Sequence, residues 1–318
     1  MENPILAVIV PCYNEEEVIE TTVNRLLEVI DGLAADGEIS PESFIYAVDD
    51  GSSDNTFNIL KSFHEKFGSK VRVLSFTRNF GNQKAILAGL TEIRKFDFDC
   101  CITIDADLQQ DETKIGEFVR KFKAGYDVVY GIRNDRKADS KFKKYSALAF
   151  YKLMNLLGSK IQANHSEYRL VSRKTVDNLS KYTETNLFLR GVFPEIERNA
   201  AFVNFDVKKR MAGTSKFSVT DLFALALQGI TSFSTVPLRM VTVTGIFVSL
   251  LSFVLCIDVI FETIFGTNNV PGWATIVCAI SFIGGVQIFF LGIIGEYLGQ
   301  LFTEVKSRPR YIVETELT

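Results

Sequence analysis

The sequence predicts an α/β protein, with a mainly parallel sheet covered by helices on both faces and a C-terminal hairpin of two transmembrane helices. Two observations predict the sheet: short apolar runs alternate with helical patterns, and polar clusters directly follow several of the runs. One observation predicts the hairpin, because only four of the 65 residues from 238 to 302 carry a formal charge. The 318 residues therefore divide into a soluble part and a membrane part.

The expected strands of the soluble part are five short apolar runs. They are Ile5–Val10, Phe44–Val48, Val71–Phe76, Cys100–Ile104 and Asp127–Tyr130. Apolar residues recur at helical spacing between these runs, most clearly over residues 19–30, and again over 59–63 and 86–93. In a sheet of this kind the ligand binds beyond the carboxyl ends of the strands, so we expect functional residues there.

Residues 217–235 predict an amphipathic helix that precedes the membrane part. Its apolar face consists of Val219, Leu222, Phe223, Ala226, Leu227, Ile230 and Phe233. Such a helix could lie in the headgroup layer of a membrane, or it could pack on the soluble domain as an ordinary core helix, and the sequence favours neither.

Two uncharged segments predict the transmembrane hairpin. Ala274–Gly295 has 22 residues, and Met240–Ile257 has 18 and can extend to Phe261, where a spanning helix needs about 20 residues. The loop between them lacks Lys and Arg, whereas basic residues flank the hairpin on both sides, which places both flanks in the cytoplasm. A buried helical hairpin of a soluble protein is the alternative interpretation.

The predicted organisation follows from these segments. It comprises a soluble domain at 1–216, the amphipathic helix at 217–235, two spans within 236–303 and a tail at 304–318. The N-terminus has no basic stretch, so we expect no cleaved signal peptide. We therefore expect a multi-pass protein of the inner membrane whose soluble domain and both termini are cytoplasmic.

Charge and cysteine content exclude several classes of protein. The formal net charge of −3 gives no support to a nucleic-acid partner, which would favour a basic face. The cysteines have neither disulfide nor zinc-site spacing, and we expect buried thiols in a reducing compartment at positions Cys12, Cys100, Cys101, Cys256 and Cys278. Dinucleotide and P-loop nucleotide motifs are absent from the sequence.

Two acidic pairs follow predicted strands. Asp105 and Asp107 come after one strand, and Asp49-Asp50 after another. Carboxylates this close repel one another unless a cation lies between them, and Mg²⁺ or Mn²⁺ commonly binds one or two carboxylates together with substrate phosphates. An isolated Asp-x-Asp is a weak signal, because many such pairs are turns or helix caps. Its position after a buried strand favours a site for a metal–diphosphate complex.

Several ordered motifs follow one another along the chain. They are Val10–Glu15, Val48–Asp54, Arg78–Gly81, Asp105–Gln109, Gly131–Arg133, Tyr168–Leu170 and Arg210–Ser218. Together they resemble glycosyltransferase family 2, and more narrowly the polyprenyl-phosphate glycosyltransferases, which include bactoprenol glucosyltransferases and dolichol-phosphate mannose synthases. The resemblance extends over about residues 5–235, and the hairpin resembles the bactoprenol branch. It implies a Rossmann-like fold of the GT-A type.

The resemblance also implies roles for individual residues. Those that line the pocket for the nucleotide and its sugar would be Pro11, Tyr13, Glu15, Val48, Asp50, Asp105, Ala106, Gln109 and Arg133. The divalent cation, Mg²⁺ or Mn²⁺, would lie on Asp107 and Gln109. Phosphates of the donor or of the lipid acceptor would be bound by Arg133, Arg169, Arg210 and Lys216.

The implied reaction is an inverting transfer of a hexose from a nucleotide sugar, UDP-glucose or a related UDP-sugar, to undecaprenyl phosphate in the membrane. A lipid phosphate is already ionised near neutral pH, so its oxygen can attack the anomeric carbon without a strong base. Catalysis then depends on in-line placement and on stabilising the departing diphosphate. Asp105 and Asp107 are the expected catalytic carboxylates.

One segment departs from the family pattern Asp-x-Gly-Asp-Phe-Arg-Leu. Here it reads Asn-His-Ser-Glu-Tyr-Arg-Leu over residues 164–170. Glu167 keeps a carboxylate and is the candidate to orient the acceptor or to act as a base. A structural ion pair with a nearby arginine is the alternative interpretation of Glu167.

Three other functions remain open. A processive polysaccharide synthase would carry a Gln-x-x-Arg-Trp motif, but the only tryptophan is Trp273, in the predicted loop of the hairpin. An inactive, membrane-anchored nucleotide-sugar-binding protein is the second, and a nucleotidyltransferase with a similar sheet is the third. We also expect a homo-oligomer, since Gly284, Gly285, Gly292 and Gly295 allow close helix approach.

Overall fold

The structure is a computed structural model that describes residues 3–134, 165–185, 187–208, 236–265 and 272–318. The chain forms two compact units. One contains residues 1–152, 160–217 and 308–318, and the other contains residues 153–159 and 218–307. The predicted amphipathic helix at 217–235 and the candidate residues Arg210 and Lys216 lie outside the described ranges.

The first unit is built on an eight-stranded sheet with the order β7-β5-β6-β4-β1-β2-β3-β8. Neighbouring strands from β4 to β3 are parallel, whereas β6 and β8 run antiparallel to their neighbours. The mainly parallel sheet predicted from the sequence is therefore confirmed. The strands are β1 (Leu6–Cys12), β2 (Phe44–Asp49), β3 (Val71–Phe76), β4 (Cys100–Thr103), β5 (Val128–Arg133), β6 (His165–Ser172), β7 (Ala200–Phe205) and β8 (Val313–Leu317).

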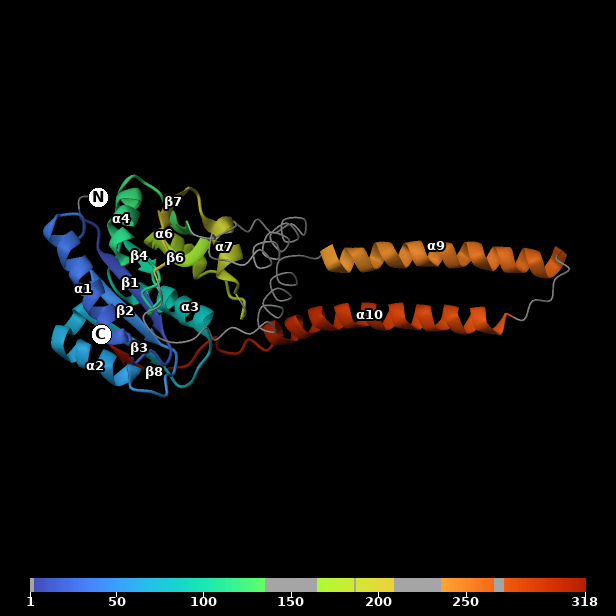
Figure 1. Cartoon of the computed structure of the whole chain (residues 1–318), viewed down its shortest axis with the longest axis horizontal. Helices are drawn as coiled ribbons and strands as arrows, with labels where there is room; N and C mark the ends of the chain where they lie inside the picture. Colours follow the sequence, from blue (N-terminus) through green and yellow to red (C-terminus); the bar gives the residue numbers. More distant parts are fainter. Residues whose placement is uncertain (1–2, 135–164, 186, 209–235, 266–271) are drawn as a thin grey trace. The chain divides into compact units, whose positions relative to one another are not determined.

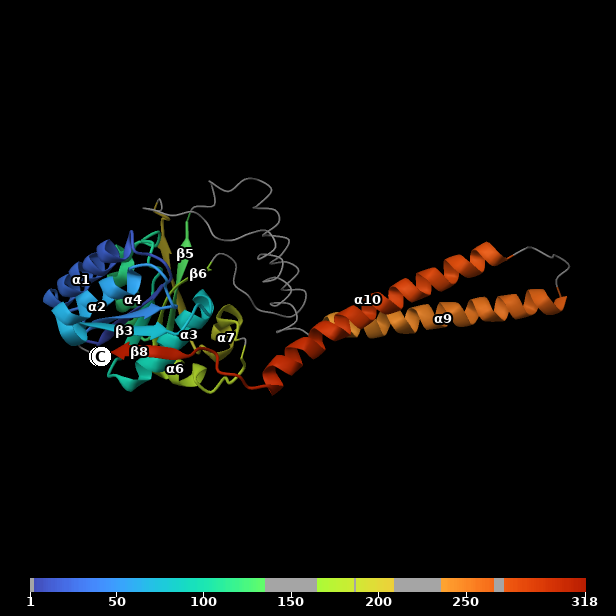
Figure 2. The ribbon, with the colours of Figure 1, turned by 90° about the horizontal axis from the view of Figure 1, so that it is seen from below.

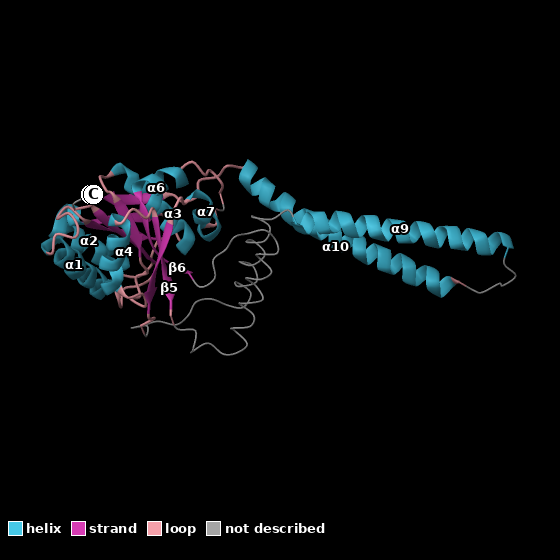
Figure 3. Cartoon of the chain, turned by 90° about the horizontal axis from the view of Figure 1, so that it is seen from above, coloured by secondary structure: helices cyan, strands magenta, loops and turns pink. Residues whose placement is uncertain are grey.

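Helices cover both faces of this sheet, as predicted (Figure 1). One layer contains α1, α2 and α4, and the other contains α3, α6 and α7, a division that is also visible in Figures 2 and 3. The first layer consists of α1 (Ile19–Ala35), α2 (Thr56–Phe67) and α4 (Ile115–Lys123). The second consists of α3 (Asn82–Glu92), α6 (Arg173–Leu179) and α7 (Leu189–Ile196).

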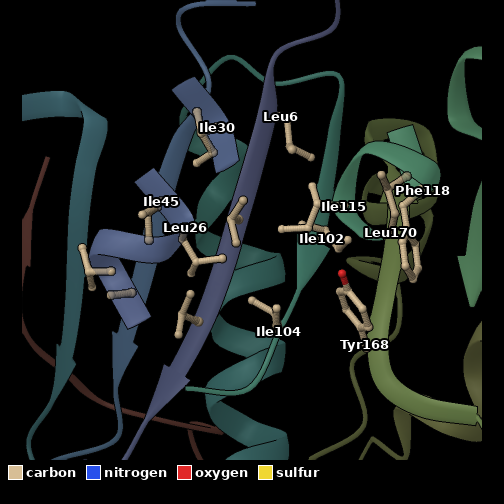
Figure 4. Close-up of a cluster of buried hydrophobic side chains, with 14 of the residues drawn as sticks. Leu6, Leu26, Ile30, Ile45, Ile102, Ile104, Ile115, Phe118, Tyr168 and Leu170 are labelled. Atoms are coloured by element: carbon tan, nitrogen blue, oxygen red, sulfur yellow. The ribbon is translucent and has the colours of Figure 1, made fainter. Parts of the chain in front are cut away.

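The main apolar core lies between the sheet and the α1–α2–α4 layer (Figure 4). Alternate residues of β1 point into it, because side chains along a strand alternate between the two faces. From α1 it receives Ile19, Val23, Leu26 and Ile30, the residues whose spacing predicted that helix. The described cysteines Cys12, Cys100 and Cys101 are free and buried, as the sequence analysis expected.

Helix α3 lies unusually close to the opposite face because of Gly89. A Cβ atom at this position would lie 2.5 Å from Cγ2 of Ile9 and 3.2 Å from Cγ2 of Val48. A larger residue would therefore push α3 away from β1 and β2.

Three strands were not predicted from the sequence, namely β6, β7 and β8. β8 is the most distant in sequence, since it follows both apolar helices and then pairs antiparallel with β3. The sequence analysis treated residues 304–318 as a tail, and the structure adds that Val313–Leu317 completes the edge of the sheet.

The second unit contains two long helices, α9 (Val236–Phe265) and α10 (Trp273–Val305), which run in opposite directions (Figure 1). Large apolar side chains on both are exposed to a degree unusual for a soluble protein, including Phe247 at 66% and Phe289 at 65%. Within the described residues, one stretch, Phe282–Val305, is long and apolar enough to cross a membrane. Two spans remain a prediction.

Candidate functional site

The loops that follow β1 and β2 are joined by several hydrogen bonds. The backbone amide of Asn14 donates to Oγ of Ser52 at 3.0 Å, and that of Glu15 donates to Oγ1 of Thr56 at 2.9 Å. In return, the amide of Ser53 donates to Oδ1 of Asn14 at 2.9 Å. These hydrogen bonds therefore tie the motif Val10–Glu15 to the motif Val48–Asp54 at the carboxyl end of the sheet.

Asp49 and Asp50 are buried and bonded to the protein. Oδ2 of Asp49 accepts a bond from Oγ of Ser75 at 2.8 Å. The two carboxylate oxygens of Asp50 accept bonds from the backbone amides of Phe80, at 2.6 Å, and Gly81, at 2.8 Å. Burial raises the pKa of Asp50, and these two amides oppose the shift. Asp50 thus holds the loop between β3 and α3 in place.

Gly51 lets the same two loops meet backbone to backbone. Its φ angle is +65°, and a Cβ atom there would lie 2.3 Å from the carbonyl carbon of Arg78. Any other residue would combine an unfavourable left-handed conformation with a clash that backbone atoms cannot relieve. The glycine of the Asp-Asp-Gly-Ser motif therefore has a structural role that its sequence position alone does not reveal.

The second acidic cluster lies in the loop that follows β4. Gln110 holds Asp105 from two sides, because its Nε2 donates to Oδ2 of Asp105 at 2.6 Å and its Oε1 accepts from the Asp105 amide at 3.0 Å. The amide of Gln109 donates to Oδ1 of Asp107 at 3.1 Å. Leu108 has a positive φ angle of 52°, which marks a sharp turn between the two. The turn brings the backbone amide of Gln109 to the carboxylate of Asp107. The cation site on these two residues stays a prediction.

The pKa of Asp105 is raised to about 7. Burial is the largest cause, and the negative charges of Asp107 and Glu167 add to it. Arg133 and Arg190 act in the opposite direction. The structure therefore gathers three carboxylates and two guanidinium groups, from five separate positions in the chain, within electrostatic reach of one another.

Glu167 is held by two arginines. Its Oε2 accepts from Nη2 of Arg169 at 2.7 Å, and its Oε1 accepts from Nε of Arg190 at 2.6 Å. Both residues of β6, Glu167 and Arg169, lie on the face opposite Tyr168 and Leu170, which belong to the core shown in Figure 4. The arrangement matches the ion pair that the sequence analysis named as the alternative for Glu167.

Arg169 and Arg190 differ in exposure. Arg169 is 1% exposed, and its guanidinium lies over the ring of Phe193 at 4.4 Å. Burial lowers the pKa of Arg169, and the charge of Glu167 opposes this shift. The Arg190 side chain is 35% exposed. Of these two arginines, only Arg190 is open to solvent.

Lys208 connects the end of β7 to the second acidic cluster. Its backbone amide donates to the carbonyl oxygen of Gln109 at 2.9 Å. Its ammonium group pairs with Oδ1 of Asp111 at 3.0 Å and with Oε2 of Glu112 at 2.6 Å. The chain segment that precedes the predicted phosphate-binding residues Arg210 and Lys216 is therefore fixed beside the loop of Asp107 and Gln109.

The remaining predicted site residues fall into two groups. Pro11, Val48 and Ala106 are buried, and Val48 packs toward Gly89 of α3. In contrast, Tyr13 and Glu15 are partly exposed and Arg133 is exposed. Arg210 and Lys216 lie outside the described residues, so their predicted role as phosphate ligands stays a prediction.

The donor set in the second cluster suits a divalent cation that also binds a substrate. Burial and two neighbouring negative side chains, Asp107 and Glu167, raise the pKa of Asp105, a cost that a nearby cation would relieve. Over the described ranges, however, no group of three or more His, Cys, Asp or Glu side chains is arranged to hold a metal ion by itself. Mg²⁺ or Mn²⁺ would need oxygens from a diphosphate and from water to complete its coordination.

The sequence analysis did not identify Arg190 or Lys208. Arg190 sits within Leu-Arg-Gly, which carries no recognisable motif, so its approach to Glu167 becomes visible only in three dimensions. Lys208 opens the run Lys-Lys-Arg at 208–210, of which Arg210 was predicted to bind phosphate, whereas Lys208 served only to orient the hairpin. The basic run itself is visible in the sequence, but its position next to the acidic loop is not.

Comparison with known families matches both units. Residues 7–180 match the family described as glycosyl transferase family 2. Residues 236–301 match the family described as the GtrB C-terminal hairpin. A family 2 domain followed by this hairpin is the combination that the sequence resemblance implied.

Several curated proteins are similar over almost the whole chain. An uncharacterized glycosyltransferase of Bacillus subtilis, YkoT, is 43% identical over 316 residues, covering 99% of this chain and 92% of the relative. The bactoprenol glucosyl transferase of Shigella phage SfX is 38% identical over 312 residues, covering 98% and 99%. The solved mannosyl-3-phosphoglycerate synthase of Rubrobacter xylanophilus aligns at a TM-score of 0.48 and 15% identity over 74% of each chain, which adds nothing to these matches.

Proposed function

The chain belongs to glycosyltransferase family 2, and from this premise we propose that it transfers a hexose, with inversion, from a UDP-sugar to a polyprenyl phosphate in the membrane. UDP-glucose or a related sugar is the proposed donor, and undecaprenyl phosphate is the proposed acceptor. Relatives named as bactoprenol glucosyl transferases support a glucosyl group and a bactoprenol acceptor, and UDP as the nucleotide rests on the sequence resemblance. The observation that carries the proposal is the charge cluster of Asp105, Asp107 and Glu167 at the carboxyl end of the parallel sheet.

On the donor side, Asp107 and Gln109 are the proposed holders of Mg²⁺ or Mn²⁺, which when bound would stabilise negative charge on the diphosphate. Asp105 lies next to them, with its carboxylate fixed by Gln110. The hydrogen-bonded loops after β1 and β2 are proposed to line the nucleotide pocket. Tyr13 and Glu15 are its partly exposed residues.

On the acceptor side, we assign different roles to the members of the Glu167 group. Glu167 already accepts bonds from two arginines, so it is better suited to positioning them than to taking a proton. The partly exposed Arg190 would contact a phosphate, and the buried Arg169 would act through Glu167. An ionised lipid phosphate needs no general base, so this assignment is consistent with the chemistry.

The hairpin would hold the enzyme at the membrane that contains its acceptor. The sheet includes strands from before α9 and from after α10, because β8 pairs with β3. Both ends of a membrane-spanning hairpin must then lie on the same side of the bilayer. Lys and Arg flank the hairpin, and the positive-inside bias makes that side the cytoplasm.

The test is transfer by the purified full-length protein in nanodiscs that contain undecaprenyl phosphate. UDP-glucose, UDP-galactose, UDP-N-acetylglucosamine and GDP-mannose are compared with Mn²⁺, with Mg²⁺ and with a chelator. We expect one UDP-sugar to give a lipid-linked product that depends on the cation. Transfer from none of the four donors, or transfer that a chelator leaves unchanged, would contradict the proposal or its metal component, respectively.

A further inference from the structure

We propose that Tyr311, in the segment that leads into β8, is a positioning residue for the donor nucleotide. It holds the loop at 77–81, which in turn is bonded to Asp50. This inference rests on the proposed function, because it assumes that the loops after β2 and β3 border a nucleotide. It adds a contribution from the C-terminal end of the chain to a site built from its N-terminal half.

The first supporting observation is that the C-terminal segment pairs beyond the end of β3. The ladder joins Val73 to Leu317 and Phe76 to Val313, with a register irregularity at Ser75 and Phe76. It then continues into the loop, where the amide of Thr77 donates to the carbonyl oxygen of Ile312 at 3.1 Å. A strand that only covered the sheet edge would need no contact with this loop.

The second observation is a chain of aromatic contacts that ends at Asp50. The Tyr311 ring stacks on Phe76, with centroids 5.2 Å apart and an interplanar angle of 13°. Phe76 meets Phe80 edge to face at 5.7 Å. The amide of Phe80 then donates to Oδ1 of Asp50 at 2.6 Å. Moving Tyr311 therefore changes the packing of the residue whose amide fixes the Asp50 carboxylate.

The third observation is that Tyr311 is itself anchored. Its hydroxyl donates to Oε1 of Glu92, at the end of α3, at 2.6 Å. Glu92 also pairs with Lys95 at 2.7 Å, and Lys95 pairs with Glu316 of β8 at 2.9 Å. Burial and the Glu92 carboxylate raise the pKa of Tyr311, so it stays protonated and can donate this bond. Tyr311 is thus held both by its ring face, on Phe76, and by its hydroxyl, on Glu92, which suits a residue that positions others.

Tyr311 follows closely after the end of the hairpin in the chain. Helix α10 ends at Val305, and residues from Arg308 onward belong to the first unit, which contains the sheet. Tyr311 therefore belongs to the short stretch that connects the hairpin to the sheet. Through it, the segment that leaves the hairpin contacts the loop proposed to support the donor.

The test uses the full-length protein and three variants. Tyr311→Ala removes both the stack and the hydroxyl, and Tyr311→Phe keeps the stack. Phe67→Ala is the matched control, because it breaks the Phe63–Phe67 stack, which has the same interplanar angle of 13° but lies on α2. Calorimetry measures the Kd of UDP and of GDP with Mn²⁺, and hydrogen exchange reports the amides at 77–81.

We expect Tyr311→Ala to weaken UDP binding by about 3- to 10-fold, the range that one lost aromatic pair represents. The amides at 77–81 should exchange faster in this variant. Tyr311→Phe keeps the stack and loses only the bond to Glu92, so its UDP affinity should lie between those of wild type and Tyr311→Ala. Phe67→Ala should lower the melting temperature without changing UDP affinity. If Tyr311→Ala does not accumulate as folded protein, Tyr311→Leu keeps apolar volume without the stack and should show the same changes.

Two results would overturn the inference while leaving the proposed function intact. One is wild-type UDP affinity in the folded Tyr311→Ala or Tyr311→Leu variant. The other is an equal loss of affinity in Phe67→Ala, which would show a general effect of stability. If the wild-type protein binds neither UDP nor GDP, the proposed function fails and this inference fails with it.

Discussion

The two acidic clusters of the first unit both lie at the ends of strands of the sheet, but their surroundings differ. Asp49 and Asp50 are buried, and Asp50 uses both of its oxygens to bind backbone amides of the next loop. Asp105 and Asp107 lie in a turn, are partly exposed, and share their electrostatic environment with Glu167. The first cluster thus resembles a structural brace, and the second a site prepared for positive charge.

The difference teaches that adjacency to a strand end does not by itself define a metal site. Both clusters occupy the edge where ligands bind in a parallel sheet. What separates them is the surroundings of the carboxylates, because both oxygens of Asp50 accept backbone amides, whereas Asp105 is bonded to the Gln110 side chain and lies near two further carboxylates. Burial is the largest cause of the raised pKa at both residues; two backbone amides oppose it at Asp50, whereas the charges of Asp107 and Glu167 add to it at Asp105.

The largest expected effect tests the second cluster directly. Asp107→Asn should lower transfer by at least about 100-fold, because it weakens the stabilisation of charge on the leaving diphosphate. The unfolding free energy should change little. Transfer and thermal melting are measured together, and Asp97→Asn is the control, since that side chain is 97% exposed. Normal cation-dependent turnover in Asp107→Asn would refute the metal assignment.

The next effect tests the first cluster as a brace. Asp50→Asn replaces one acceptor oxygen with a donor that faces a backbone amide, so we expect a loss of about 1–3 kcal/mol in the unfolding free energy. Denaturant titration measures it. The different roles of the two clusters would be contradicted if Asp50→Asn were as stable as wild type, or if Asp107→Asn destabilised the protein by the same amount.

A third effect concerns pH and the crowded charges of the second cluster. The pKa of Asp105 is about 7 in the folded protein and about 3.9 in an unfolded chain. The folded state therefore binds the proton more tightly, and its contribution to stability is lost as the pH rises toward 7. For metal-free protein we expect wild type to lose about 1–2 kcal/mol relative to Asp105→Asn between pH 5 and pH 7.

Denaturant titrations of both proteins at several pH values check this prediction. Adding Mn²⁺ and UDP should flatten the difference, because a bound cation favours the ionised carboxylate. If the unfolding free energies of the two proteins depend on pH in the same way in the absence of metal, the pKa of Asp105 is not raised by its neighbours and its burial.

The smallest expected effect concerns Lys208, which braces the loop of the second cluster. Its side chain is 42% exposed, so we expect Lys208→Met to cost less than about 1 kcal/mol in stability. The affinity for UDP with Mn²⁺ should fall by up to about fivefold. Arg120→Met breaks a comparably exposed ion pair with Glu38 and is the control, which should leave that affinity unchanged. Equal affinities for the two variants would assign Lys208 a purely structural role.

The sequence by itself determined the fold class, because the signals involved are local. Five apolar runs predicted β1 to β5 to within a few residues, and the spacing of Ile19, Val23, Leu26 and Ile30 predicted the buried face of α1. The near absence of charge over 238–302 likewise predicted the long apolar helices. Each inference needed only neighbouring residues.

Only the tertiary structure decided which polar residues meet. β6 has the mixed sequence His-Ser-Glu-Tyr-Arg-Leu-Val-Ser and no apolar run, so neither its pairing with β4 nor the bond from Arg190 to Glu167 was visible. The return of β8 to β3 joins residues more than 230 positions apart. Such contacts depend on how distant elements pack around the core, and no local periodicity records that arrangement.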